Sequence, residues 1–122
     1  IEPLMLDRFH FQNTISNLID NAIKYSDTLK IVDITAYINK EQLVIVVKDY
    51  GKGISKEQQR YIFDRFYRAP TGDLHQVKGF GLGLAYVKKI IEKHKGTVSI
   101  KSQVGKGSEF FVYLPINQEI SN

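Results

Sequence analysis

The chain has 122 residues, of which 43% are hydrophobic and 25% are charged, a composition typical of one folded domain. It contains no cysteine, which excludes disulfide scaffolds, thiolate metal sites and cysteine nucleophiles. The net charge of +4 is small and the lysines are spread along the chain, so we expect no nucleic-acid partner.

The first predicted element is an amphipathic helix with Asp7 as its N-cap, and it ends near Tyr25. Apolar residues recur along it at helical spacing, which predicts one buried face. These residues are Phe11, Ile15, Leu18, Ile19, Ala22 and Ile23. Two strands follow at residues 31–38 and 42–48, and the short polar connection between them predicts an antiparallel hairpin.

Ser55, with a Gln three residues later, is typical of a capping box and predicts a short helix that reaches about Phe66. Residues 67–78 have no regular period and predict a mobile segment. A third helix follows a glycine-rich run, and we expect Gly96 to end it as the C′ residue.

Two further strands are predicted at residues 97–102 and 108–114. Strands and helices do not alternate one for one, which argues against a doubly wound parallel sheet. We therefore expect an α+β fold, a two-layer α/β sandwich in which about three helices cover one face of a mixed, mostly antiparallel sheet. Residues 1–122 form one domain in this interpretation.

Three polar residues of the first helix, Asn17, Asn21 and Lys24, share one face because they are spaced by four and three positions. A solvated helix face is the simpler interpretation. However, amide oxygens are suitable neutral ligands for Mg²⁺, and a lysine one turn later can contact phosphate. The stripe therefore indicates a candidate metal–phosphate site.

The segment Asp49–Gly53 leaves the end of an apolar strand. An ordinary turn would also contain Asp and Gly. In the functional interpretation, the Asp49 carboxylate accepts a hydrogen bond from an exocyclic amine, and the glycines let the backbone approach a flat ring.

The run Gly79–Leu84 stands at the start of a predicted helix, where free N–H groups and the helix dipole attract an anion. It is neither a Walker loop nor a Rossmann fingerprint, because the required Lys-Ser/Thr and the sixth-position Gly or Ala are missing. A glycine-rich turn without a ligand is the alternative.

The segment Ile62–Arg68 combines aromatic and basic residues. Phe63 and Phe66 are predicted to pack in the core. Arg65 and Arg68 border the predicted mobile segment, from which they can reach a phosphate. The three histidines of the chain have neither metal-ligand spacing nor a catalytic Ser-His-Asp arrangement.

In this order, the segments resemble the catalytic ATP-binding domain of two-component sensor histidine kinases. Residues 17–26 resemble the N box, 49–53 the first glycine box, 62–68 the F box, 79–84 the second glycine box and 105–110 the closing segment. The resemblance covers about residues 4–115. It extends to the wider ATPase superfamily of gyrase, the Hsp90 chaperones and MutL, and implies their Bergerat-type fold.

The resemblance implies ATP and Mg²⁺ as cofactors, with Asn21 as the magnesium ligand. It implies catalytic roles for Asn17, Lys24, Arg65 and Arg68. Nucleotide-binding residues implied in the same way are Asn21, Tyr25, Asp49, Gly51, Gly53, Ile54, Gly79, Gly81, Leu82, Gly83, Leu84 and Ser108. Ser108 stands where the family more often has Thr, a change that keeps the hydroxyl.

Asn17 separates the kinases from their hydrolase relatives, because gyrase-type enzymes have a Glu at this position as the general base for water. An amide has no useful basicity. The expected reaction is therefore transfer of the γ-phosphoryl group to a histidine on a separate dimerisation and phosphotransfer domain, which this chain lacks. The alternatives are an ATP-binding sensing module without catalysis and an anti-sigma-type protein serine kinase.

The resemblance also implies partners and a location. The direct partner is the protein's own dimerisation and phosphotransfer domain, and a response regulator is reached indirectly. The longest aliphatic run, Leu43–Val47, is far too short to span a membrane. The resemblance implies that the chain is the cytoplasmic domain of a membrane-anchored sensor kinase. We also expect the family's first strand to be truncated at residues 1–6.

Overall fold

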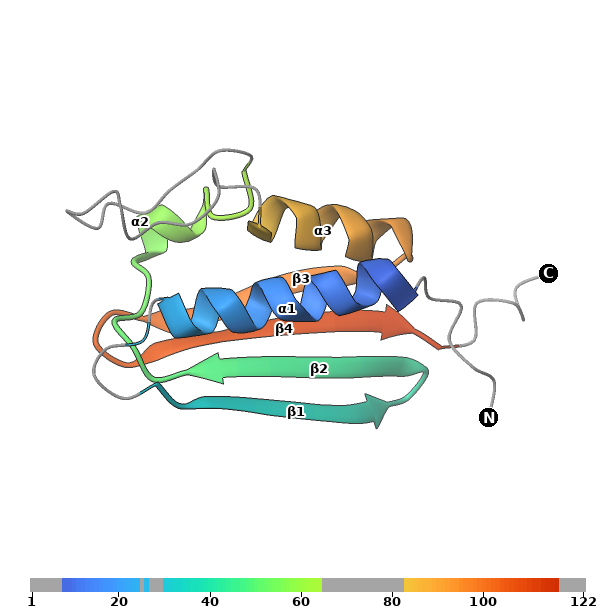
Figure 1. Ribbon diagram of the computed structural model, residues 1–122, viewed down its shortest axis with the longest axis horizontal. Coiled ribbons are helices and arrows are strands. Elements are labelled where there is room, and N and C mark those ends of the chain that lie inside the picture. The colour runs from blue at the N-terminus through green and yellow to red at the C-terminus, as the bar shows by residue number, and fades with distance from the viewer. Residues whose placement is uncertain (1–7, 25, 27–29, 65–82, 117–122) are drawn as a thin grey trace.

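The computed structural model describes residues 8–24, 26, 30–64 and 83–116. One layer is a four-stranded antiparallel sheet with the order β1-β2-β4-β3, and the helices lie on one face of it (Figure 1). In chain order the elements are α1 (Arg8–Lys24), β1 (Val32–Asn39), β2 (Gln42–Asp49), α2 (Lys56–Gln59), α3 (Gly83–Lys93), β3 (Thr97–Gln103) and β4 (Gly107–Pro115). The predicted two-layer α+β sandwich is confirmed.

The core lies between the helices and the two central strands. Leu18 and Ala22 of α1 and Val87 of α3 pack toward alternate residues of β2 and β4, among them Val47 and Phe110. Because side chains alternate across a strand, one face of each central strand supplies the core. Burial of these apolar side chains orients both helices over the sheet.

The prediction that Ile23 belongs to the buried face of α1 is wrong. Ile23 is 43% exposed, whereas Leu18 and Ala22 are almost completely buried. Five residues at 100° each place Ile23 about 140° around the helix from Leu18. The buried stripe of α1 is therefore narrower than the apolar pattern predicted.

β2 and β4 pair along their whole lengths, and this pairing joins two hairpins that are local in sequence. In the β1–β2 hairpin, Lys40 adopts a left-handed conformation with φ of 59° in the tight connection. At the opposite end of the sheet, Asp49 at the end of β2 pairs with Ser108 at the beginning of β4. Two residues far apart in sequence thus meet at one end of the central strands.

Two helix ends differ from the sequence prediction. Ser55 is the N-cap of α2 as predicted, and its Oγ accepts from the Gln58 N–H at 3.2 Å. The helix ends at Gln59 because the following N–H groups, including that of Tyr61, bond to carbonyls three residues back. The predicted end at Phe66 and the segment 67–78 lie outside the described residues.

At the end of α3, Lys95 and not Gly96 adopts the left-handed conformation, with φ of 66°. The Gly96 N–H bonds to the Ile91 carbonyl at 2.9 Å and the Lys95 N–H bonds to the Glu92 carbonyl at 3.0 Å, which is a Schellman motif. Gly96 is needed for another reason: a Cβ there would lie 2.1 Å from the Tyr113 carbonyl oxygen. The glycine permits close packing of the helix end against β4.

Candidate nucleotide site

Four elements carry the predicted site residues. The last turn of α1, the end of β2 and the beginning of β4 lie toward the left of Figure 1, and the first turn of α3 stands nearer the middle of the view, beside α1. Described residues in these elements and the adjoining loop are Asn17, Asn21, Lys24, Asp49, Gly51, Gly53, Ile54, Gly83, Leu84 and Ser108. Predicted residues outside the described ranges are Tyr25, Arg65, Arg68, Gly79, Gly81 and Leu82.

Asp49 is a buried carboxylate at the end of β2, with 2% of its surface exposed. Its Oδ1 accepts from the Gly51 N–H at 2.9 Å, and the backbone N–H of Ser108 also bonds to the carboxyl group. Burial raises the pKa of Asp49 above its ordinary value, while the two backbone hydrogen bonds oppose this rise. The strand end therefore holds a buried carboxylate with two backbone N–H donors.

Two glycines bring the surrounding backbone close to Asp49. A Cβ on Gly107 would lie 2.2 Å from the Asp49 carbonyl oxygen, and a Cβ on Gly53 would lie 2.1 Å from the Gln103 carbonyl oxygen. Both glycines have positive φ, 95° and 76° respectively. The loop after β2 and the β3–β4 turn consequently touch backbone to backbone, where any side chain would separate them.

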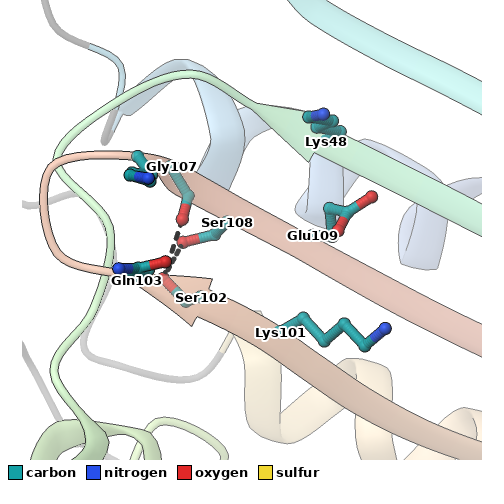
Figure 2. A pocket seen from close by; sticks show the side chains of 8 residues that line it. Lys48, Lys101, Ser102, Gln103, Gly107, Ser108 and Glu109 are labelled. Carbon is teal, nitrogen blue, oxygen red and sulfur yellow. Dashed lines mark hydrogen bonds between the residues drawn. The ribbon is translucent and has the colours of Figure 1, made fainter.

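Ser108 and Ser102 form a hydroxyl pair beside Asp49. Their Oγ atoms are 2.7 Å apart, and Ser102 Oγ also donates to the Gly107 carbonyl at 3.0 Å and accepts from the Ile54 N–H at 2.7 Å. Figure 2 shows both serines directed toward one another from adjacent strands. Sequence reasoning identified Ser108 and Ile54 but missed Ser102.

The signal for Ser102 was present in the strand alternation. Val98, Ile100 and Ser102 occupy every second position of β3 and are more buried than their neighbours. A serine at the core-facing position of a strand requires a hydrogen-bond partner, since a buried hydroxyl without one is costly. Its position next to the turn glycines indicates a structural link to the loop after Asp49.

Tyr50, the second residue of the predicted loop, does not join this cluster. Its hydroxyl donates to the Asp33 carboxylate on β1, and its ring lies under Lys48 Nζ, 4.9 Å from the ring centroid. The hydrogen bond to Asp33 raises the pKa of Tyr50. Alternation at the strand end thus places Asp49 on the helix side and Tyr50 on the open side.

The polar edge of α1 lies opposite the start of α3. Asn17, Asn21 and Lys24 are all half-buried on this helix, as their spacing predicted. Asn17 Nδ2 donates to the Asn13 carbonyl at 2.9 Å, and its Oδ1 lies 3.2 Å from where a Cβ on Gly83 would stand. The amide oxygen of Asn17 is therefore directed at the first residue of α3.

The C-terminal end of α1 is held by side-chain hydrogen bonds. Ser26 Oγ donates to the Ala22 carbonyl at 2.8 Å, and Lys30 Nζ donates to the Ile23 and Ser26 carbonyls, each at 3.3 Å. A cation at a helix C-terminus also complements the helix dipole. These contacts support the turn that carries Asn21 and Lys24.

Phe63 packs in the core as predicted. Its ring meets Phe110 edge to face, with the centroids 6.2 Å apart, and Lys88 Nζ lies 5.9 Å from its centroid. This contact attaches the segment after α2 to β4 and α3. Phe66, its predicted companion, lies outside the described residues.

A shallow cavity of about 250 Å³ opens at the β3–β4 end of the sheet (Figure 2). Its rim is polar, with Lys48, Glu109 and Lys101 in one cross-strand row on the open face. Ser102 and Ser108 also line this opening, and none of its lining residues comes from a described helix. Surface lysines alternating with a glutamate are typical of a solvated strand face.

The described residues contain no group of three or more His, Cys, Asp or Glu side chains placed to hold a metal ion. None of the described helices is both long and apolar enough to cross a membrane.

Comparison with known proteins gives a consistent set of relatives. Residues 6–118 match the family described as "Histidine kinase-, DNA gyrase B-, and HSP90-like ATPase". The chain is 45% identical over 115 residues to the sensor protein RprX of Bacteroides fragilis, covering 93% of this chain and 22% of RprX. It is 44% identical over 102 residues to the sensor histidine kinase RppB of Synechocystis, covering 84% of this chain and 22% of RppB.

A solved structure agrees with these sequence matches. The mycobacterial sensor histidine kinase MprB superposes with a TM-score of 0.75 at 29% identity, covering 89% of this chain and 72% of that one. The chain thus spans about a fifth of the length of the two sensor proteins it matches.

Proposed function

The chain belongs to the family of histidine kinase-, DNA gyrase B- and HSP90-like ATPases and is a histidine kinase catalytic domain, and from this premise we propose that it binds Mg-ATP and transfers the γ-phosphoryl group to a histidine on a separate domain. The observation that carries the proposal is the placement of the predicted site residues around α1. Its polar edge lies beside the start of α3, where Asn17 approaches Gly83, and its buried face packs on β2, which ends at the buried Asp49 carboxylate.

In this proposal the adenine ring binds against the wall formed by Asp49 and Ser108. Asp49 has lost its hydration through burial, and its backbone partners satisfy only part of its capacity to accept hydrogen bonds. An exocyclic amine supplies the missing donor. Ile54 is buried beside this wall and would offer apolar surface to the ring, while the close backbone contact at Gly53 fixes the loop that carries Gly51 against the β3–β4 turn.

The residues present fit a magnesium ion bound mainly by phosphate and water. Mg²⁺ prefers oxygen ligands and is usually held by one or two protein groups together with substrate phosphates. Asn21 would supply that protein oxygen, from a helix turn held by the contacts of Ser26 and Lys30. When bound, the ion would neutralise charge on the phosphate oxygens as transfer proceeds.

Phosphoryl transfer depends mainly on positioning and electrostatic stabilisation. Lys24, and Arg65 and Arg68 from the segment after α2, would supply positive charge to the phosphates, and the glycines before α3 would let the chain approach them. Asn17 directs an amide oxygen, which is no general base, toward the start of α3. An external nucleophile is therefore favoured over activated water.

The proposed acceptor is a histidine of the protein's own dimerisation and phosphotransfer domain, with a response regulator as the next acceptor. We further propose that this catalytic domain works on the cytoplasmic side of a membrane-anchored sensor. The relatives RprX and RppB are sensor proteins several times longer than this chain, which supports a multidomain context.

Transfer to histidine can be tested with the purified chain, a purified dimerisation and phosphotransfer domain, and radiolabelled ATP. We expect Mg²⁺-dependent labelling that is acid-labile, as phosphohistidine is. Asn21→Ala should abolish labelling, whereas Asp20→Ala, which alters an exposed neighbour on the same helix, should not. Acid-stable label would identify a serine kinase instead, and nucleotide binding without any label would identify a sensing module.

A further inference from the structure

Ser102 is a centre of hydrogen bonds beside the nucleobase wall, which is the surface formed by Asp49 and Ser108. Ser102 lies on β3, and β4 separates it from Asp49 on β2. Its Oγ has three partners from two segments: Ile54 of the loop after β2 at 2.7 Å, and Gly107 at 3.0 Å and Ser108 at 2.7 Å at the start of β4. A hydroxyl can donate once and accept twice, so three partners use its full capacity. Loss of this one oxygen would disturb both segments.

The direction of each hydrogen bond follows from the chemistry of the partners. The Gly107 carbonyl can only accept and the Ile54 N–H can only donate. The single proton of Ser102 is therefore used on Gly107, and the bond between the serines must be donated by Ser108. Ser108 is consequently held in one rotamer, with its proton directed at Ser102 and its lone pairs left for other partners.

A second set of contacts reinforces the same junction. Gln59 Nε2 donates to the Ile54 carbonyl at 2.7 Å and to the Ser102 carbonyl at 3.2 Å, and the Gly105 N–H bonds to the Lys52 carbonyl at 2.6 Å. These bonds attach Lys52 and Ile54 of the loop after β2 to the β3–β4 turn and to the end of β3. The loop conformation that surrounds Asp49 therefore depends on β3 as well as on β2.

We propose that Ser102 is a positioning residue for nucleobase recognition, which acts through Ser108 and Ile54 and not through the phosphate end of the site. This inference rests on the proposed binding of ATP. It predicts a division of effects: removing the Ser102 hydroxyl weakens binding of the base and leaves binding of the phosphates unchanged.

The test compares three ligands with the 122-residue chain by NMR titration in the presence of Mg²⁺: ATP, adenosine and inorganic tripolyphosphate. Ser102→Ala should weaken ATP and adenosine by the same factor, about fivefold or the size of one net hydrogen bond, because Ser108 and Ile54 are no longer held in place. Tripolyphosphate affinity should stay within twofold of the original. A parallel loss for tripolyphosphate would show a general structural role and overturn the proposal.

Variants of matched chemistry complete the experiment. Ser102→Thr keeps the hydroxyl and should restore adenosine binding. Ser102→Cys keeps the size of the side chain but lacks a good acceptor, so it should weaken adenosine as Ser102→Ala does. It serves as the second test if Ser102→Ala folds poorly. Ser99→Ala, on the exposed side of the same strand, should change nothing.

A double-mutant cycle tests the route through Ser108. Combining Ser102→Ala with Ser108→Ala should weaken adenosine less than the product of the two single effects, because both remove the same hydroxyl pair. A loss equal to that product overturns the proposed coupling. If the unmodified chain bound neither adenosine nor ATP, the proposed function itself would fail. If the unmodified chain bound both ligands and Ser102→Ala left this binding unaltered, only the role of Ser102 would fail.

Discussion

The two halves of the candidate site differ in how far their polar groups are already satisfied. At the nucleobase wall, Asp49 and Ser108 are 2% and 5% exposed and have hydrogen-bond partners in the protein. At the polar edge of α1, Asn17 and Asn21 remain half-buried, and the amide nitrogen of Asn17 donates to the Asn13 carbonyl of its own helix.

This difference indicates that the two halves recognise their ligand groups in different ways. The wall is organised by the fold, so under the proposed function little ordering would be needed when a base binds. The edge would offer oxygen atoms whose arrangement phosphates and a cation complete. The following predictions test whether the halves are as independent as this comparison suggests.

The largest expected effect is the loss of the close backbone contact at the wall. Gly53→Ala should reduce the free energy of unfolding by about 3 kcal/mol, from strain at positive φ together with a clash against the Gln103 carbonyl. Gly105→Ala is the matched control, because its φ is also positive but open space surrounds it, and it should cost about 1 kcal/mol. Urea denaturation measures both. Equal losses would show that the contact contributes nothing.

Removal of the buried charge should affect binding strongly. Asp49→Asn is expected to weaken ATP binding about 50-fold, because a charge-assisted hydrogen bond to the base amine is lost. Calorimetric titration gives the affinity. Asp33→Asn, which alters the Tyr50 partner on the open face, should leave it unchanged. A similar loss in both variants would mean that charge acts at long range rather than by contact.

At the polar edge, Asn21→Ala should weaken ATP binding about tenfold in the presence of Mg²⁺, in keeping with the loss of one ligand oxygen. The deficit should disappear when the metal is chelated, and adenosine binding should stay unaltered. Titrations with and without EDTA provide the measurement. A deficit that persists without metal would contradict the assigned ligand role.

The buried side of the same helix offers a contrast in stability. Within the described residues Thr14 Oγ1 is fully buried and has no hydrogen-bond partner. Thr14→Val should therefore raise the free energy of unfolding by about 1 kcal/mol. Thermal denaturation can check this, with the exposed Thr35→Val as a control expected to have little effect.

The smallest effect concerns pH. Burial raises the pKa of Asp49 in the folded state above the ordinary value of 3.8, so the folded protein binds this proton more tightly than the unfolded chain does. The stability contributed by this tighter proton binding at Asp49 is complete below pH 3.8 and is lost as the pH rises through the folded-state pKa of Asp49. Asp49→Asn should remove this dependence, and denaturation across that pH range would reveal whether it does.

The sequence predicted the fold class, all four strands and the positions of the three helices because local patterns encode them. Alternation in β2, the helical stripe of α1 and the Ser55 cap are short-range signals. The pairing of Asp49 with Ser108 is different: it joins residues far apart in the chain, and no local pattern specifies it. Only the family resemblance brought those two residues into one predicted site.

Ser102 and Lys95 show what local reasoning missed. The role of Ser102 depends on where Ile54 and Ser108 meet in space, which strand alternation alone cannot determine. The sequence predicted the left-handed conformation for Gly96, but Lys95 adopts it. The glycine at position 96 is required instead by the close approach of Tyr113 on another element. Roles that depend on residues 65–82 stay predictions.

The pairing of β2 with β4 also has a kinetic consequence. The two hairpins are local in sequence, whereas their junction requires closure of a long intervening segment, so we expect this junction to form late in folding. The proposed base-binding residues lie on both sides of it. A bound nucleotide would therefore link the two hairpins across this junction and stabilise the folded domain wherever ligand is abundant.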